Sequence, residues 1–132
     1  MNKEAVYVPV ISQALNEANV PLSPAIKANG FVFVSGTPPL DPVTGEIVRG
    51  DIVRQTEVVL ENLNSILHVA GSSFDKVVKA TIFISNSAYY ATVNEVYARY
   101  FPEIDPPART FVTVGSWPWE FDIEIECIAL AE

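Results

Sequence analysis

Short apolar runs bounded by turn residues predict strands in the first third of the chain. Residues 6–11 are rich in β-branched side chains but contain Pro9, which suits an edge strand. Residues 25–28 and 31–34 are apolar runs separated by Asn29-Gly30, the pair that best fits a type I′ turn because both residues tolerate positive φ. We therefore expect a β-hairpin, preceded by a polar loop over residues 13–21. It is followed over residues 37–46 by an extended loop or a second, short hairpin.

The middle of the chain changes to helical spacing. Residues 51–70 repeat apolar side chains at that spacing, with Asp51 as N-cap and Gly71 after the last turn. Residues 77–84 are nearly apolar on both faces, which is typical of a central strand. A second helix is expected from Ser87, as its cap, to about residue 100. Strands over residues 109–114 and 121–131 complete the chain.

These elements predict an α+β fold, in which one mixed β-sheet carries two helices on one face. A single domain over residues 1–132 accommodates them. The opposite face of the sheet has no helix to cover it. Because the mean hydropathy is +0.25 in a chain short enough to expose much of its surface, we expect that face to meet another copy of the chain.

Charge and residue counts exclude several functions. Sixteen acidic against eight basic residues give a net charge of −8, so neither nucleic acid nor an anionic membrane surface is an expected partner. Cys127 and His68 are the only residues of their types, which excludes an intrachain disulfide and the usual Cys/His zinc sites; no metal or cofactor is predicted. No apolar run approaches the ~18 residues of a membrane span and no signal peptide is recognised, so a cytoplasmic location is expected.

Charged residues on the last two predicted strands form the first candidate site. Glu124 and Glu126 share one face of the final strand, and a hairpin turn over residues 115–120 would set Arg109 beside both. Such a cluster is either an ordinary salt bridge or a receiver for a substrate carboxylate, which a guanidinium binds through two parallel N–H bonds. Ser35-Gly36, at the end of an earlier strand, offers a hydroxyl and close access to the backbone.

Several segments together resemble the Rid/YjgF family of reactive intermediate deaminases, formerly endoribonuclease L-PSP. They cover about residues 21–131 in the family's order and spacing: FVSG at 33–36, LDPVTGE at 40–46, QT at 55–56 with LENL at 60–63, VNEVY at 93–97, PAR at 107–109 and IEIECIA at 123–129. The resemblance implies a chorismate-mutase-like fold and a homotrimer with sheets facing inward and ligand sites between subunits. It also implies hydrolysis of enamines and imines, of the 2-aminoacrylate and 2-iminobutanoate type, to 2-oxo acids and ammonia, with no cofactor.

The resemblance also assigns roles to matching residues. Arg109 is expected to bind the substrate carboxylate, and Glu124 to position or deprotonate the attacking water. Ser35 is expected to contact the substrate or its water, and the Gly36 amide is a candidate donor to the substrate carboxylate. Orientation and one proton-handling group suffice for this chemistry.

Three further candidate substrate-binding residues mark departures from the family. Leu22 stands where deaminase members carry a tyrosine, Phe111 where many relatives carry a cysteine, and Trp117 in a turn unlike the commoner LPK version. These changes favour a larger or aromatic-flanked substrate, such as an aminomuconate-type compound. Because Leu22 offers no proton, a non-catalytic trimeric binder of small carboxylates is the second alternative. RNA cleavage, also attached to the family, is disfavoured by the net charge and the lone His68.

Overall fold

The computed structural model describes residues 2–131; the ends of the predicted domain, residues 1 and 132, lie outside the described residues. The six strands of this part form one sheet in the order β1-β2-β3-β6-β4-β5. The strands are β1 (Glu4–Val6), β2 (Ala25–Ala28), β3 (Phe31–Thr37), β4 (Val77–Ile84), β5 (Ala108–Thr113) and β6 (Ile123–Leu130). The helices are α1 (Ile11–Glu17), α2 (Ile52–Val69) and α3 (Tyr90–Tyr97), with 3₁₀ turns η1 (Phe74–Lys76) and η2 (Ser87–Tyr89).

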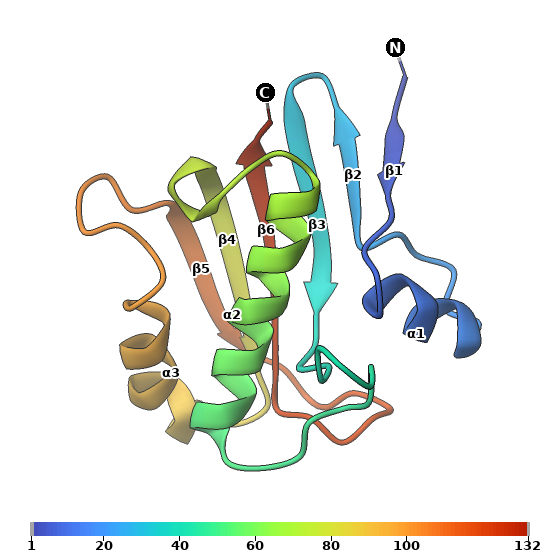
Figure 1. Cartoon of the computed structure of the whole chain (residues 1–132). Coiled ribbons are helices and arrows are strands. Elements are labelled where there is room, and N and C mark those ends of the chain that lie inside the picture. The colour runs from blue at the N-terminus through green and yellow to red at the C-terminus, as the bar shows by residue number, and fades with distance from the viewer. Residues whose placement is uncertain (1, 132) are drawn as a thin grey trace.

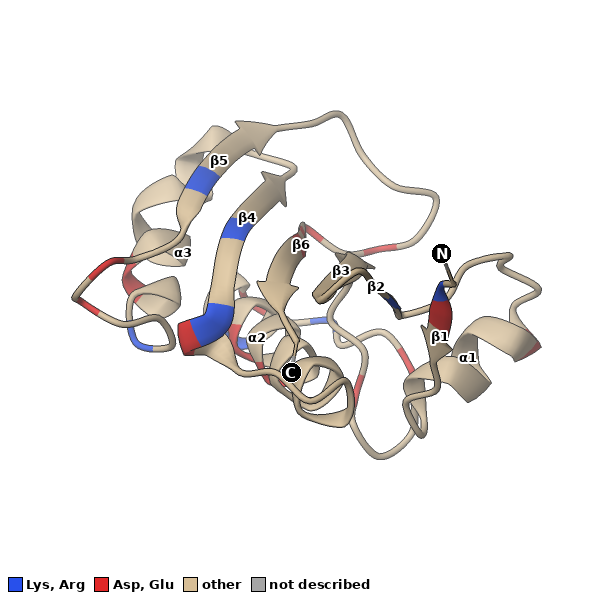
Figure 2. Ribbon diagram, turned by 90° about the horizontal axis from the view of Figure 1, so that it is seen from above, with Lys and Arg blue, Asp and Glu red and all other residues tan. Residues whose placement is uncertain are grey.

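The mixed sheet with α2 and α3 on one face is confirmed. Only β4 and β5 are parallel, and the other neighbouring strands pair antiparallel. Both α2 and α3 lie on the same side of the sheet (Figures 1 and 2). The core between these layers is apolar, and its largest fully buried side chains come from α2, β4 and β6 and include Leu60, Leu63, Ile82, Ile84, Ile123 and Ile125.

Local signals placed several elements correctly. Asn29 and Gly30 have φ of 56° and 82°, and the hairpin between β2 and β3 is confirmed. The Asp51 side chain accepts a hydrogen bond from Arg54 N at 2.9 Å and so caps α2, as predicted. The isolated bridge between residues 40 and 47 confirms the second short hairpin.

The N-terminal prediction was wrong in part. The first strand ends at Val6, and residues 11–17 form α1 instead of continuing a strand into a polar loop. Val10 has φ of 71° and no side chain caps the helix, so the usual start signal is missing. Ile11 and Leu15, one turn apart, pack against the core and stabilise the helix through tertiary contacts.

The predicted hairpin between the last two strands was also wrong. β5 pairs in parallel with β4, and β6 lies between β3 and β4. The reason is that β4, α3 and β5 form a strand–helix–strand crossover, which leaves β5 at the sheet edge. Arg109 therefore lies beside Ala80 of β4, not beside Glu126.

The start of the second helix needs a smaller correction. Ser87 does not cap it: the Asn86 side chain accepts from Ala88 N at 2.9 Å and begins η2, which leads into α3. The helix then ends at Tyr97, about three residues before the predicted end.

The sheet face opposite α2 and α3 carries an apolar patch. Phe33, Val112 and Leu130 are each about 40% exposed there, although their side chains are large and apolar. Glu124 and Glu126 share this face, because β6 alternates between buried and more exposed positions. The shared face predicted for Glu124 and Glu126 on the last strand is thus confirmed, and Cys127, at one of the alternate positions, is buried.

Candidate functional site

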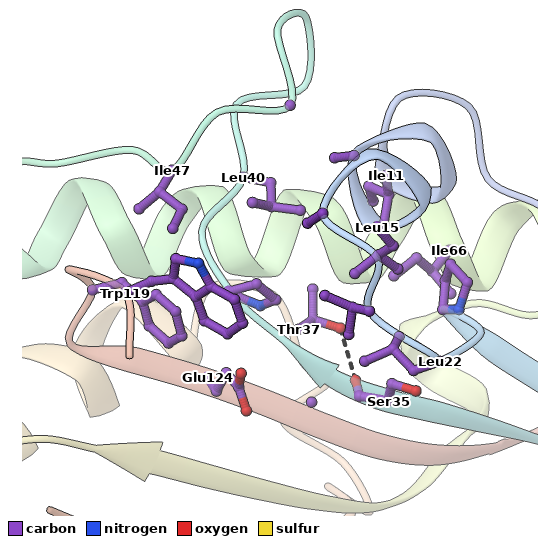
Figure 3. A pocket seen from close by; sticks show the side chains of 18 residues that line it. Ile11, Leu15, Leu22, Ser35, Thr37, Leu40, Ile47, Ile66, Trp119 and Glu124 are labelled. Carbon is purple, nitrogen blue, oxygen red and sulfur yellow. Dashed lines mark hydrogen bonds between the residues drawn. The ribbon is translucent and has the colours of Figure 1, made fainter. Parts of the chain in front are cut away.

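A pocket at the carboxyl end of β3 gathers four of the predicted site residues. Leu22, Ser35, Gly36 and Glu124 line this hollow of about 200 Å³, which we call the Glu124 pocket (Figure 3). Its other walls come from α1, the 38–47 hairpin, the inner face of α2 and the segment before β6. None of its 18 lining residues is a lysine, arginine or histidine.

A bulge in β3 places the backbone of this pocket. Val34 pairs with Cys127 whereas Thr37 pairs with Ile125, so β3 contains one residue more than β6 over this interval. At the bulge, a Cβ on Gly36 would collide with Glu124 Oε1. Gly36 is therefore needed for close approach: its missing side chain leaves the space that the Glu124 carboxylate occupies.

Ser35 is held by the segment that precedes β2. Its Oγ donates to the carbonyl of Ser23 at 2.7 Å, and its backbone N donates to the carbonyl of Pro24 at 3.0 Å. Thr37 Oγ1 in turn donates to the Ser35 carbonyl at 2.8 Å (Figure 3). Because its proton is engaged, the Ser35 hydroxyl presents lone pairs to the pocket and can accept a hydrogen bond from a donor there.

Glu124 is the only charged side chain that lines the pocket. Burial raises the pKa of Glu124, and the nearby Glu126 raises it further, while the Trp117 indole opposes the rise. A carboxylate with a raised pKa is a better proton acceptor than an ordinary surface glutamate. The pocket thus combines one basic group with apolar walls and an acceptor hydroxyl.

Arg109 lies in a second group of residues, which we call the arginine cluster: Arg109, Asn94, Tyr97, Phe111 and Tyr90. Its guanidinium donates to Asn94 Oδ1 at 2.7 Å and lies 5.0 Å from the ring centroid of Tyr97 and 5.3 Å from that of Phe111. Phe111 stacks on Tyr90 with ring centroids 4.5 Å apart. Within residues 2–131, no carboxylate lies within ion-pair distance of Arg109. The guanidinium is oriented by neutral groups and keeps its charge uncompensated.

The Glu124 pocket and the arginine cluster do not meet within one chain. Arg109 and its strand neighbour Phe111 face α3, whereas Glu124 lies on β6 with β4 between them, and it points to the open face. The candidate residues therefore divide into two half-sites. Neither half-site alone holds both a cation for a carboxylate and a base for water.

Three residues at these half-sites, Asn94, Tyr97 and Trp119, were not among the site residues predicted from the sequence. Asn94 and Tyr97 contact Arg109 from one side of α3, and their spacing of three residues was the available signal. Trp119 lines the Glu124 pocket and is 50% exposed. Trp117 instead lines a neighbouring hollow of about 400 Å³, and its ring is tilted by 32° against that of Phe121, with centroids 4.6 Å apart. It therefore acts on Glu124 from outside the pocket wall.

Comparisons with known proteins agree on one family. The family profile described as Endoribonuclease L-PSP matches residues 12–131. A RutC family protein of Pyrococcus horikoshii is 50% identical over 112 residues, which are 85% of this chain and 88% of that protein. The protein named Reactive Intermediate Deaminase A, chloroplastic, of Arabidopsis thaliana is 48% identical over 109 residues, 83% of this chain and 58% of that protein.

A solved structure extends the agreement to the whole fold. The crystal structure of YyfA from Yersinia pestis, described as a protein of unknown function of the conserved Rid family, has a TM-score of 0.89 and 40% sequence identity, and the match covers 98% of this chain and 100% of that one. None of the helices in the described part is long and apolar enough to cross a membrane. On sequence and structure alike, the chain belongs to the Rid/YjgF family.

Proposed function

We propose that the protein hydrolyses the C=N bond of reactive imines that carry a carboxylate, and of the enamines that tautomerise to them. The products are a 2-oxo acid and ammonia. Family membership and the name of the Arabidopsis relative support this kind of reaction. The observation that carries the proposal is the division of the site: a base in a pocket lined by no cation, and a guanidinium without a carboxylate partner.

The two halves become one site when Arg109 of one protomer faces the Glu124 pocket of its neighbour. In a cyclic trimer, unlike surfaces of neighbouring protomers meet at every interface, so each interface would contain one complete site. The apolar patch on the open face of the sheet supports such an assembly, because large exposed apolar patches mark interaction surfaces. We propose a homotrimer, as the resemblance implies, with its sheets facing inward.

In this arrangement each residue has a definite task. The guanidinium of Arg109 binds the substrate carboxylate through two charge-assisted hydrogen bonds and so orients the imine carbon. Glu124 accepts a proton from water as the water oxygen bonds to that carbon and the C=N π bond breaks, and it passes this proton to the imine nitrogen, which gives a carbinolamine. Glu124 then takes the hydroxyl proton of the carbinolamine and delivers it to the amino nitrogen as the C–N bond breaks, so that ammonia leaves and the carbonyl forms. Ser35 accepts a hydrogen bond from the attacking water, and Gly36 leaves room for Glu124.

The decisive experiment uses two inactive variants that complement each other. Arg109→Ala and Glu124→Gln are each expected to lower kcat/KM for 2-iminobutanoate strongly, since one charge-assisted bond is worth about 1.5–3 kcal/mol. When equal amounts are unfolded together and refolded, about a quarter of the interfaces pair an intact Arg109 with an intact Glu124. Activity near a quarter of the wild-type level supports a shared site. No recovery on mixing, although both variants refold and assemble, contradicts it.

The same imine assay and the same two variants distinguish two other candidate functions from imine hydrolysis. Leu22, which lines the pocket and has no proton to give, favours a carboxylate binder as the second candidate. A binder would hold 2-oxobutanoate but leave the lifetime of the imine unchanged. RNA cleavage would have to proceed without a histidine or lysine in the pocket, and cleavage that persists in both variants would point to it.

A further inference from the structure

The walls of the Glu124 pocket suggest which imines it accepts. The polar groups Ser35 and Glu124 lie at one side, and the remaining walls are largely aliphatic or aromatic (Figure 3). The apolar walls combine α1 with the 38–47 hairpin, α2 and the turn before β6: Ile11, Leu15, Leu40, Ile47, Ile66 and Trp119. Such a division separates a reacting end from a recognition end.

The size of the pocket sets an upper bound on the group that it can hold. An apolar cavity of about 150 Å³ is large enough for a benzene ring. The Glu124 pocket, at about 200 Å³, therefore has room for a branched or aromatic side chain, and a methyl group would leave most of it to water. Leu22 enlarges the apolar surface at the rim, where it is 42% exposed.

Charge excludes a different class of large substrate. The apolar end contains no lysine, arginine or histidine, and the only charged lining residue is Glu124, which is itself acidic. A second carboxylate on the substrate would lose its hydration there without gaining a cation. A dicarboxylate such as an aminomuconate-type compound is therefore a poor fit, although it is large enough to be considered.

We propose that the preferred substrates are 2-imino acids whose side chains are apolar and range in size from isobutyl to benzyl. This inference rests on the proposed function, because it assumes that the imine carbon lies beside Glu124. The carboxylate and the side chain are bonded to the same imine carbon, so a carboxylate held at the interface directs the side chain toward Leu15 and Ile66. Selectivity then comes from α1 and Trp119, and the reaction itself from Glu124 and Arg109.

The test compares imines that differ only in their side chains. D-Amino-acid oxidase with catalase generates the imines of D-alanine, D-leucine and D-phenylalanine in place, D-aspartate oxidase generates 2-iminosuccinate, and semicarbazide traps the surviving imine. We expect kcat/KM for the leucine- and phenylalanine-derived imines to exceed that for 2-iminopropanoate at least about tenfold. Hydrolysis of 2-iminosuccinate should be slower than that of 2-iminopropanoate. Equal rates, or a preference for either small or dicarboxylic imines, would overturn the inference.

Variants on α1 locate the selectivity. Leu15→Trp fills the apolar end, so it should lower kcat/KM for the phenylalanine-derived imine at least about tenfold more than it lowers kcat/KM for 2-iminopropanoate. Gln13→Trp is the matched control, since Gln13 is exposed on the same helix and does not line the pocket. Ala18→Trp, at an exposed lining position, replaces Leu15→Trp if that variant does not fold.

The outcomes separate this inference from the proposed function. A protein that hydrolyses 2-iminopropanoate but shows no preference, or whose preference survives the filled pocket, contradicts only the side-chain assignment. A folded, assembled protein that hydrolyses none of the four imines contradicts the proposed function itself.

Discussion

The hydroxyl of Tyr97 offers a stability test whose size follows from the structure. Tyr97 is 6% exposed, and its Oη is buried with no hydrogen-bond partner in the described part of the chain. Burial raises the pKa of this phenol to about 12, so it stays neutral at pH 7. A buried polar group without a partner costs about 1–3 kcal/mol. Tyr97→Phe removes that cost and keeps the ring that stacks on Phe101 at 4.2 Å.

We therefore expect Tyr97→Phe to raise the free energy of unfolding by about 1–3 kcal/mol. In a domain of this length each kcal/mol corresponds to roughly 3–5 °C in Tm. Urea denaturation at a fixed protomer concentration, together with thermal unfolding, measures both quantities. Tyr90→Phe is the control, because Tyr90 is 47% exposed and its replacement should stay within about 0.5 kcal/mol.

Destabilisation by Tyr97→Phe would refute the reasoning. It would mean that the hydroxyl has a partner in the assembled protein, either a water or a group from a neighbouring protomer. Activity adds a second readout: Asn94 still holds Arg109 in the variant, so imine hydrolysis should persist, whereas its loss would assign the hydroxyl to the chemistry.

Three other substitutions or reactions test separate features. Gly36→Ala should displace the Glu124 carboxylate and lower kcat about 100-fold. Gly115→Ala, where an added Cβ meets nothing within 4 Å, should leave kcat unchanged, and equal effects of the two substitutions would contradict the close-approach argument. Asp51→Ala should lower the free energy of unfolding in urea by about 1 kcal/mol, and an unchanged value would mean that the cap is replaced by water. Burial raises the pKa of the Cys127 thiol from 9.0 to about 12, so at pH 8 the native protein should hold about a thousandfold less thiolate than the unfolded protein. Native protein should therefore react with Ellman's reagent correspondingly slowly, and fast labelling of native protein would show that the thiol is accessible.

The elements predicted best from the sequence are those whose signal lies within a few neighbouring residues. The Asn29-Gly30 turn and the Asp51-capped helix each carry their own local signal, and both are present. α1 has no such signal, because it lacks a capping side chain and is stabilised by the packing of Ile11 and Leu15 against the core. The pairing of β6 with β3 and β4 is a choice among distant partners, which periodicity along one strand does not encode.

The candidate site shows the same difference between residues with a local sequence signal and residues that depend on tertiary structure. Family-like motifs identified Ser35, Gly36 and Glu124, and a departure from the family identified Leu22; these four residues do line one pocket. The proximity of Arg109 to the glutamates was derived from an assumed hairpin, and it failed with that hairpin. The contributions of α1 and Trp119 to the pocket depend on tertiary packing, so no local pattern pointed to them.

The place of β6 in the sheet has a consequence for how the chain is made. In chain order β6 is the last strand of the sheet, yet it joins two halves that are otherwise unconnected by strand pairing, β1-β2-β3 and β4-β5. Until β6 has been synthesised, both halves expose open edges that can pair with other nascent chains. A stop codon ahead of β6 should therefore yield insoluble material, not a shorter folded protein.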